Sequence, residues 1–383
     1  METKNRKRLL GFLLILVSFP LVQKNLEIFS GLGLSGDFTN ASDVSFSWEK
    51  WWDGSFQQGK NNYINDQVGF RPDLVRINNQ LDYWLFNKVH SNSVVLGTHK
   101  CLFQKDYIKA YFGRDFVGYQ TILNNAVKLK AIQDTLAHLG KSLILVHSAC
   151  KAFFYPGYFP EDMVGPHVGP TNYETYKRVC DSLGVNQVDF NAWLVSMRDT
   201  SKALLYPLEG VHWSVYGSVL AADSLVKYIE KLRNIRMPGI TWDSITHTTK
   251  ARFTDNDIYR ALNLTFPMVK EDFSYPNVRY LDDSTKKKPV AIYIGDSFLL
   301  NFLGDNLMTG TNTDWDIWYY FKRVIKEGNR NNVDAWINMD NYDWISKMNN
   351  SDCIILMYTS HNLKEIGNGF IDKAYDHFYP AKK

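Results

Sequence analysis

The sequence predicts an α/β fold with a mainly parallel central sheet. Short apolar runs rich in β-branched residues, typical of buried strands, alternate along the chain with segments of helical periodicity. Polar, reactive side chains stand directly after several of these runs, and parallel strands end at a common edge of their sheet. With 383 residues the chain is long enough to bury a large core. We therefore expect a functional site at the carboxyl edge of the sheet.

The N-terminus has the composition of a targeting segment. Lys4, Arg6, Lys7 and Arg8 precede an apolar run over residues 9–22. No small-x-small cleavage site follows this run, so residues 1–22 are interpreted as an uncleaved signal anchor, with a cleaved signal peptide as the alternative. The positive-inside rule then places the rest of the chain outside the cytoplasm, in the periplasm and attached to the inner membrane.

The remaining chain is expected to form a linker and one domain. Residues 23–45 are rich in Gly, Ser and Asn and predict a linker that leaves the membrane. Residues 46–375 are assigned to a single α/β domain. Within it, residues 234–288 are polar and irregular, and we interpret them as an insertion.

The periodicities predict helices and strands in alternation. Thr171 and Glu174 have the spacing of a capping box, which marks a helix start. Helices are expected over 74–86, 121–139, 171–182, 191–197 and 218–232, and one that ends at 348. Strands are expected over 94–97, 101–103, 142–146, 185–190, 290–294 and 353–358.

Composition excludes some functions and leaves others open. A formal net charge of +3 is too mild to indicate a nucleic-acid partner. Aromatic residues make up 15% of the chain, which fits either sugar-stacking surfaces or a large aromatic core. The cysteines Cys101, Cys150, Cys180 and Cys353 lack the spacing of a metal site, so neither a metal nor another cofactor is expected. Their sequence positions fit disulfides and buried free thiols equally well.

Ser297 is the candidate nucleophile. The apolar run from Val290 to Ile294 ends abruptly in Gly295-Asp296-Ser297-Phe298, which predicts a buried strand that delivers a serine to the sheet edge. A serine in such a turn is a nucleophile if a histidine reaches it. The alternative is an ordinary turn, because Gly, Asp and Ser are all common turn residues.

His212 is the candidate base and Glu209 the candidate orienting acid. His212 lies in a loop just before the helix expected from residue 218, where reactive side chains are often displayed. Glu209 precedes it by three residues. A carboxylate bonded to one ring nitrogen fixes the tautomer and leaves the other nitrogen free to take the serine proton. A capping histidine and a solvated loop acid are the structural alternatives.

Further polar and aromatic residues are candidates for substrate or oxyanion binding. They are Asp296, Asn301, Lys151, Trp213 and Tyr155. The Lys151 ammonium would bind an anionic sugar or pair with an acid in the core. His361, which also follows an expected strand, is a further possible partner for the histidine–serine pair.

Several short motifs occur in one order along most of residues 48–370. They are Tyr63–Asp66 with Phe70–Arg71, Val94–Gly97 with Leu102–Phe103, Lys151 with Tyr155–Pro156, His212–Trp213, Gly295–Phe298, and Asp352–Leu356. In this order the chain resembles the SGNH-hydrolase-like family of alginate O-acetyltransferases, the AlgJ/AlgX type.

The resemblance implies a three-layer α/β/α SGNH-like fold with a permuted motif order, in which the histidine precedes the serine. It implies transfer of acetyl groups to polysaccharide hydroxyls outside the cytoplasm, within exopolysaccharide biosynthesis. Ser297 matches the family nucleophile and His212 the family base. The acetyl donor implied by the resemblance is a membrane-bound O-acyltransferase partner, and the acceptor is a polysaccharide.

One departure from the family pattern bears on activity. The family has an aspartate two residues before the histidine, and this chain has Gly210 there. Glu209 occupies the position at which ordinary SGNH hydrolases carry their acid. If Glu209 does not reach the imidazole, the triad becomes a dyad. The sequence therefore leaves open a carbohydrate acetyl esterase and a non-catalytic polysaccharide-binding or assembly protein with a degenerate triad.

Overall fold

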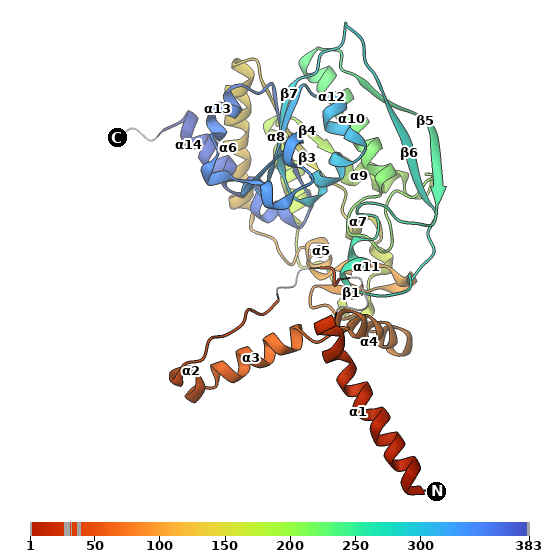
Figure 1. Cartoon of the computed structure of the whole chain (residues 1–383). Coiled ribbons are helices and arrows are strands. Elements are labelled where there is room, and N and C mark those ends of the chain that lie inside the picture. Colours follow the sequence, from red (N-terminus) through yellow and green to blue (C-terminus); the bar gives the residue numbers. More distant parts are fainter. Residues whose placement is uncertain (1, 27–30, 32, 37–39, 381–383) are drawn as a thin grey trace. The chain divides into compact units, whose positions relative to one another are not determined.

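The computed structural model describes residues 2–26, 31, 33–36 and 40–380. The chain forms two compact units (Figure 1). Unit 1 contains Met1–Asn92 and Ile258–Pro267, and unit 2 contains Ser93–Asp257 and Met268–Lys383. The sequence-based assignment of residues 46–375 to a single domain stays a prediction.

A seven-stranded sheet forms the centre of unit 2. Its strand order is β10-β9-β8-β7-β11-β3-β4. The strands are β3 (Ser142–His147), β4 (Gln187–Asp189), β7 (Val290–Gly295), β8 (Asp314–Tyr319), β9 (Arg323–Lys326), β10 (Ile337–Asn338) and β11 (Cys353–Tyr358). The strands β8, β7, β11, β3 and β4 run parallel to one another, and at one edge β9 pairs antiparallel with β8 and β10 pairs antiparallel with β9. The prediction of an α/β fold with a mainly parallel sheet is confirmed.

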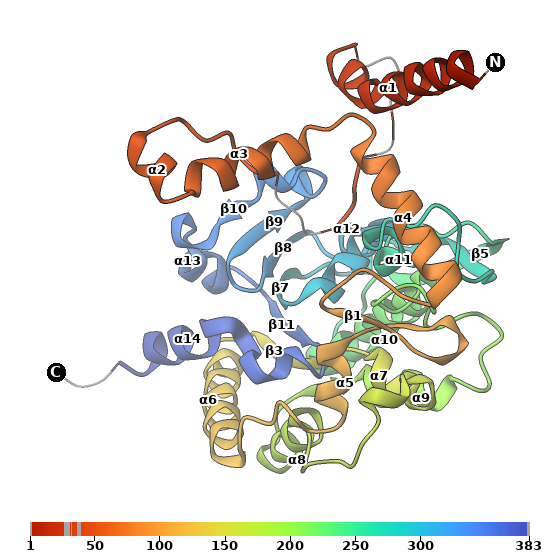
Figure 2. The ribbon, with the colours of Figure 1, turned by 90° about the horizontal axis from the view of Figure 1, so that it is seen from below.

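Helices cover both faces of this sheet (Figures 1 and 2). On one face lie α6 (Tyr119–His138), α8 (Asn172–Leu183), α13 (Trp344–Asn349) and α14 (Phe370–Phe378), which share an apolar core with alternate strand residues such as Leu145, Ile294 and Leu356. On the other face lie α10 (Val215–Arg233) and α12 (Leu307–Thr311), whose residues line a small cavity together with Tyr293 of β7. The result is a three-layer α/β/α arrangement.

The strands β3, β7 and β11 and the helices α6, α8 and α10 lie near the bounds that the sequence predicted. Thr171 caps α8 with the predicted capping box. The remaining elements are β1 (Val94–Leu96), β2 (Leu102–Gln104), α5 (Lys105–Tyr111), α7 (Lys151–Phe154) and α9 (Phe190–Met197). The strands β8, β9 and β10 had no counterpart among the expected elements.

The segment interpreted as an irregular insertion is more ordered than expected. It contains the long antiparallel pair β5 (Gly239–Thr248) and β6 (Phe273–Leu281), with the short helix α11 (Asp257–Ala261) between them. Many side chains of both strands face solvent, so the hydrophobic alternation that identifies strands is weak there.

Unit 1 is mainly helical. It contains α1 (Glu2–Leu26), α2 (Trp48–Trp52), α3 (Ser55–Asp66) and α4 (Arg71–Phe86). Lys4–Leu26 is long and apolar enough to cross a membrane, with a mean hydropathy of 1.7. This is compatible with the expected anchor. The linker expected over 23–45 lies partly outside the described residues.

All four cysteines are buried free thiols. Burial raises the pKa of Cys150 to about 11 and that of Cys353 to about 12, so neither thiol is activated.

Candidate active site

Ser297 stands where β7 ends and the chain turns sharply. A Cβ on Gly295 would lie 2.0 Å from the carbonyl oxygen of Met357 in β11, so only glycine lets β7 turn this close to its neighbour. Asp296 caps the 3₁₀ segment that follows, accepting a hydrogen bond from the Phe298 amide at 3.1 Å. Ser297 itself is half-buried and so retains access to solvent.

Asp296 fastens this turn to the loop after β11. Its second carboxylate oxygen accepts hydrogen bonds at 2.8 Å from the Thr359 amide, the Thr359 hydroxyl and the Asn362 side-chain amide. The side chain is fully buried. Asp296 is therefore an organiser of the turn, and the expectation that it binds substrate is corrected.

His212 reaches Ser297 from the opposite side of the site. It lies two residues before Ser214, whose hydroxyl caps α10 by accepting from the Gly217 amide at 3.0 Å. The Nε2 atom of His212 is 2.8 Å from the Ser297 hydroxyl, although the two residues are 85 positions apart. The structure thus brings together the serine and histidine that the sequence singled out.

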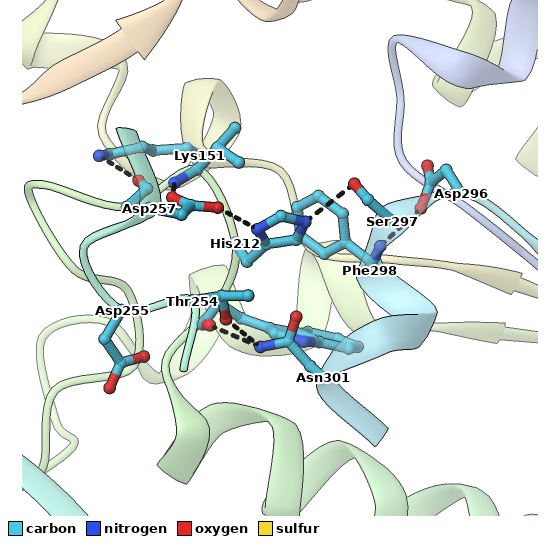
Figure 3. A network of polar contacts seen from close by, with 12 residues as sticks. Lys151, His212, Thr254, Asp255, Asp257, Asp296, Ser297, Phe298 and Asn301 are labelled. Carbon is cyan, nitrogen blue, oxygen red and sulfur yellow. Dashed lines mark hydrogen bonds and ion pairs between the residues drawn. The ribbon is translucent and has the colours of Figure 1, made fainter. Parts of the chain in front are cut away.

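Asp257 holds the other ring nitrogen of His212 (Figure 3). One carboxylate oxygen is 2.6 Å from Nδ1, and the other accepts the Val211 amide at 2.8 Å. Because a carboxylate can only accept here, Nδ1 carries the proton and Nε2 is free to accept the Ser297 proton. The arrangement Ser297–His212–Asp257 has the geometry of a serine-hydrolase triad.

Glu209 does not contact the imidazole. Its carboxylate accepts the backbone amides of Met268 at 2.8 Å and Val269 at 3.2 Å, and burial raises its pKa. The expected orienting acid is therefore corrected from Glu209 to Asp257.

The backbone explains why an acid is missing at position 210. A Cβ on Gly210 would lie 2.8 Å from the Thr254 carbonyl oxygen and 2.9 Å from that of Asp255. An aspartate has no room there, because the segment that carries Asp257 already occupies the space. The acid is supplied from that segment instead.

Residues 254–257 form a scaffold behind the histidine. Asn301 donates its side-chain amide to the Thr254 hydroxyl at 2.8 Å (Figure 3). Asp255 accepts the Val215 amide at 3.1 Å and the Tyr275 hydroxyl at 2.8 Å, and burial raises its pKa to about 6. The amide of Asn301 is thus engaged in the scaffold, and its expected oxyanion role is corrected.

Lys151 is buried and supports the loop that carries His212. Its ammonium donates to the carbonyl oxygens of Leu208 and Gly210, each at 2.7 Å. Burial lowers its pKa, while Cys101, Glu271 and Asp257 lie near enough to raise it. With these contacts the buried Lys151 is not exposed to an anionic sugar, and its ammonium donates to backbone carbonyl oxygens.

Glu271 also supports this loop. Its carboxylate oxygens accept the Leu208 amide at 2.9 and 3.0 Å. Burial is the main reason that the pKa of Glu271 rises to about 7. The loop before His212 is therefore held by buried charged groups rather than by apolar packing alone.

Trp213, Tyr155 and His361 do not act on the serine or the imidazole. Trp213 is fully buried between Phe298 and Phe302. Tyr155 donates its hydroxyl to the Tyr206 carbonyl oxygen at 2.9 Å. His361 contacts Tyr107 and has a ring nitrogen 3.7 Å from Asp115. The expectation of substrate binding by Trp213 and Tyr155 is corrected to a structural role.

Tyr320 is a site residue that sequence reasoning missed. Burial and then Asp296 raise the pKa of its hydroxyl, while the backbone amide and the hydroxyl of Ser297 act to lower that pKa. Tyr320 and Phe321 have φ values of 49° and 51° in the turn between β8 and β9. Two successive bulky residues in the left-handed region are strained, and such strain is concentrated at functional sites.

The sequence did not reveal the role of Asp257, because this residue is far from His212 along the chain. It lies 45 positions from His212, in the stretch interpreted as an insertion. The only available signal was the acidic turn Thr254-Asp255-Asn256-Asp257, which by itself is ordinary loop chemistry.

Comparison with known proteins identifies the class of this fold. Residues 94–254 match the family model described as "SGNH hydrolase-like domain, acetyltransferase AlgX". The matched region includes His212 and ends before Asp257 and Ser297. The chain therefore carries an SGNH hydrolase-like domain, as the motif order predicted.

Several known proteins are similar to this chain at low sequence identity. The chain is 22% identical to the probable alginate O-acetylase AlgJ of Azotobacter vinelandii over 247 residues, covering 64% of this chain and 61% of the relative. Among solved structures, the O-acetyltransferase domain of Pseudomonas putida AlgJ has a TM-score of 0.46 at 14% identity, covering 74% of this chain and 99% of that one. Pseudomonas aeruginosa AlgX has a TM-score of 0.41 at 13% identity, with coverages of 73% and 67%. The chain is thus similar to AlgJ and AlgX, and the match to the family model lies within residues 94–254.

Proposed function

We propose that this protein is an extracytoplasmic polysaccharide O-acetyltransferase that works through an acetyl-serine intermediate. The observation that carries the proposal is the Ser297 hydroxyl 2.8 Å from His212 Nε2, with Nδ1 held by Asp257 at 2.6 Å. A degenerate triad was considered because Gly210 stands where the family has an aspartate. Asp257 lies next to His212 Nδ1 and can serve as the orienting acid instead. The probable alginate O-acetylase to which the chain is similar supports acetyl transfer to a sugar hydroxyl.

The first half-reaction forms the acetyl-enzyme. His212 Nε2 takes the hydroxyl proton as Ser297 Oγ attacks the acetyl carbonyl of the donor. Collapse of the tetrahedral intermediate breaks the bond to the leaving group, which takes the proton from His212. The Asp257 carboxylate stabilises the transient imidazolium and keeps the ring in place.

The second half-reaction delivers the acetyl group to the polymer. His212 removes the proton from a sugar hydroxyl, whose oxygen attacks the acetyl carbonyl on Ser297. The bond to Oγ breaks and Ser297 regains the proton from His212. With water in place of the sugar, the same steps hydrolyse the ester, so exclusion of water decides between transferase and esterase.

The oxyanion requires donors that point at the developing negative charge. The backbone amide of Ser297 is one candidate. The Tyr320 hydroxyl, whose pKa the Ser297 amide lowers, is the other.

The donor is expected to come from a membrane-bound O-acyltransferase partner. The apolar helix Lys4–Leu26 would keep the protein at the membrane in which such a partner resides. The two half-reactions as written use the side chains of Ser297, His212 and Asp257. Within the described residues, no group of three or more His, Cys, Asp or Glu side chains is arranged to hold a metal ion.

The experiment incubates the purified full chain with a chromogenic acetyl ester, with and without uronic-acid or neutral oligosaccharides as acceptors. Acetylated oligosaccharide formed by the wild type and lost in Ser297→Ala supports the proposal. Rapid hydrolysis that acceptors leave unchanged would indicate an esterase. Full acetylation of cellular polymer by both Ser297→Ala and His212→Ala would indicate a non-catalytic protein.

A further inference from the structure

Helix α4 of unit 1 presents an apolar face to solvent. Leu74, Ile77, Leu81, Trp84 and Leu85 recur at helical spacing and are between 46% and 68% exposed. We call these residues the α4 stripe. An amphipathic helix in a soluble protein normally turns such a stripe inward, so its exposure marks an interaction surface.

The orientation of α4 is fixed by hydrogen bonds on its opposite face. Asn79 donates to the Leu262 carbonyl oxygen at 2.9 Å. Gln80 accepts the amides of Thr265 and Phe266 at 3.0 and 2.9 Å. Rotating the helix to bury the stripe would break these bonds inside unit 1, so the outward position of the apolar face is built into the fold.

Residues next to the stripe enlarge it. Trp84 stacks on Phe266, with ring centroids 5.6 Å apart, and Phe266 is itself exposed. Phe86, at the end of α4, is also exposed. The short helix α2, in the same unit, displays Trp48 and Trp52 with no buried residue of its own. Trp is the side chain most typical of the membrane–water interface.

Helix α4 begins against the candidate membrane span. The Phe19 ring of α1 stacks on Phe70, the residue before α4, with centroids 5.2 Å apart. A Cβ on Gly69 would lie 2.2 Å from the Pro20 carbonyl oxygen of α1. Lys24, near the end of α1, is 5.8 Å from the centre of the Tyr63 ring. If α1 crosses the bilayer, α4 starts where the chain emerges from it.

We propose that α4 lies on the bilayer surface and that the α4 stripe inserts into the lipid interface. Its composition of Leu, Ile and Trp suits insertion by about 5–10 Å into the boundary between headgroups and acyl chains. Lipid is favoured over a protein partner because the stripe is continuous with the residues that pack on α1. This second attachment is independent of the acetyl-transfer chemistry and confines unit 1 to the membrane surface.

The test places an environment-sensitive fluorophore on the stripe in the full-length protein. Leu85→Cys provides an exposed thiol, and the native thiols are buried and so resist labelling. The labelled protein is reconstituted into phosphatidylcholine vesicles. Lys227→Cys, on an exposed part of α10 in unit 2, is the matched control.

The proposal predicts a blue-shifted emission at position 85 and quenching by spin-labelled lipid, with neither effect at position 227. An emission at position 85 that stays water-like and is fully quenched by aqueous iodide overturns it. Shielding that grows with the ratio of protein to lipid identifies a second copy as the occupant and also overturns it. Because position 85 lies on the surface, the labelled variant tests contact with lipid without altering the core.

Discussion

Asp257→Asn is the most informative single substitution, because it changes two hydrogen bonds of known direction. The wild-type carboxylate accepts from both the Val211 amide and His212 Nδ1. The new amide has one accepting oxygen and one donating nitrogen. The Val211 amide can only donate, so it claims the oxygen, and the amide nitrogen then faces Nδ1.

The consequence is a histidine with its proton on the wrong atom. Nδ1 must accept from the new amide, so the neutral ring carries its proton on Nε2, where it faces the Ser297 hydroxyl. The base that should take the serine proton is lost while the fold is kept. A loss of about ten-thousand-fold in turnover is expected for this change, which corresponds to about 5 kcal/mol of transition-state stabilisation.

The assay is turnover of a chromogenic acetyl ester by the full chain, with melting temperature as the check on folding. Glu209→Gln is the matched control, because a glutamine oxygen still accepts the Met268 and Val269 amides. We expect that control to stay within a few-fold of the wild type. The reasoning is refuted if Asp257→Asn keeps more than about a tenth of wild-type turnover while Glu209→Gln loses most of it.

Three further outcomes follow from the same site. Tyr320→Phe removes one proposed oxyanion donor and should lower kcat by about 10²–10³-fold with little change in melting temperature; an unchanged kcat removes Tyr320 from the mechanism. Glu271 has a folded-state pKa of about 7, above its usual value, so its contribution to stability is present below about pH 4.5 and is lost as the pH rises through 7. At pH 8 the free energy of unfolding of Glu271→Gln, measured with urea, should therefore exceed that of the wild type by up to about 3 kcal/mol, and at pH 4 the two should be equal. The same difference at both pH values would contradict this. Lys151→Met leaves the buried Gly210 carbonyl oxygen without its ammonium donor and should lower the free energy of unfolding by about 1–3 kcal/mol. A melting temperature equal to that of the wild type would contradict this.

Much of the fold was accessible from hydrophobic periodicity. The strands β3, β7 and β11 are buried on both faces, and such strands give continuous apolar runs that are easy to recognise. The partly exposed pair β5 and β6 gives no such run, so the segment that contains it was interpreted as irregular. Solvent exposure, rather than a lack of regular structure, hid these strands.

Only those residues of the candidate site that local sequence determines could be predicted. Ser297 and His212 each stand at an element boundary that the sequence marks. Glu209 was chosen by its distance along the chain, but the backbone turns its carboxylate toward Met268, and Asp257 arrives from a distant segment. Tyr320 lies near Ser297 because the backbone turns in the left-handed region at Tyr320, and no glycine or asparagine at that position predicts such a turn. Such long-range contacts depend on tertiary packing.

The central claim is that Ser297 carries the acetyl group between donor and acceptor. The direct measurement is mass spectrometry of the full chain after brief mixing with an acetyl ester and an acid quench, followed by peptide mapping. We predict one added acetyl group on the peptide that contains Ser297, absent in Ser297→Ala and discharged when an oligosaccharide acceptor is present. Catalytic turnover with no acetyl group on Ser297, or with the acetyl group on another residue, would contradict the account.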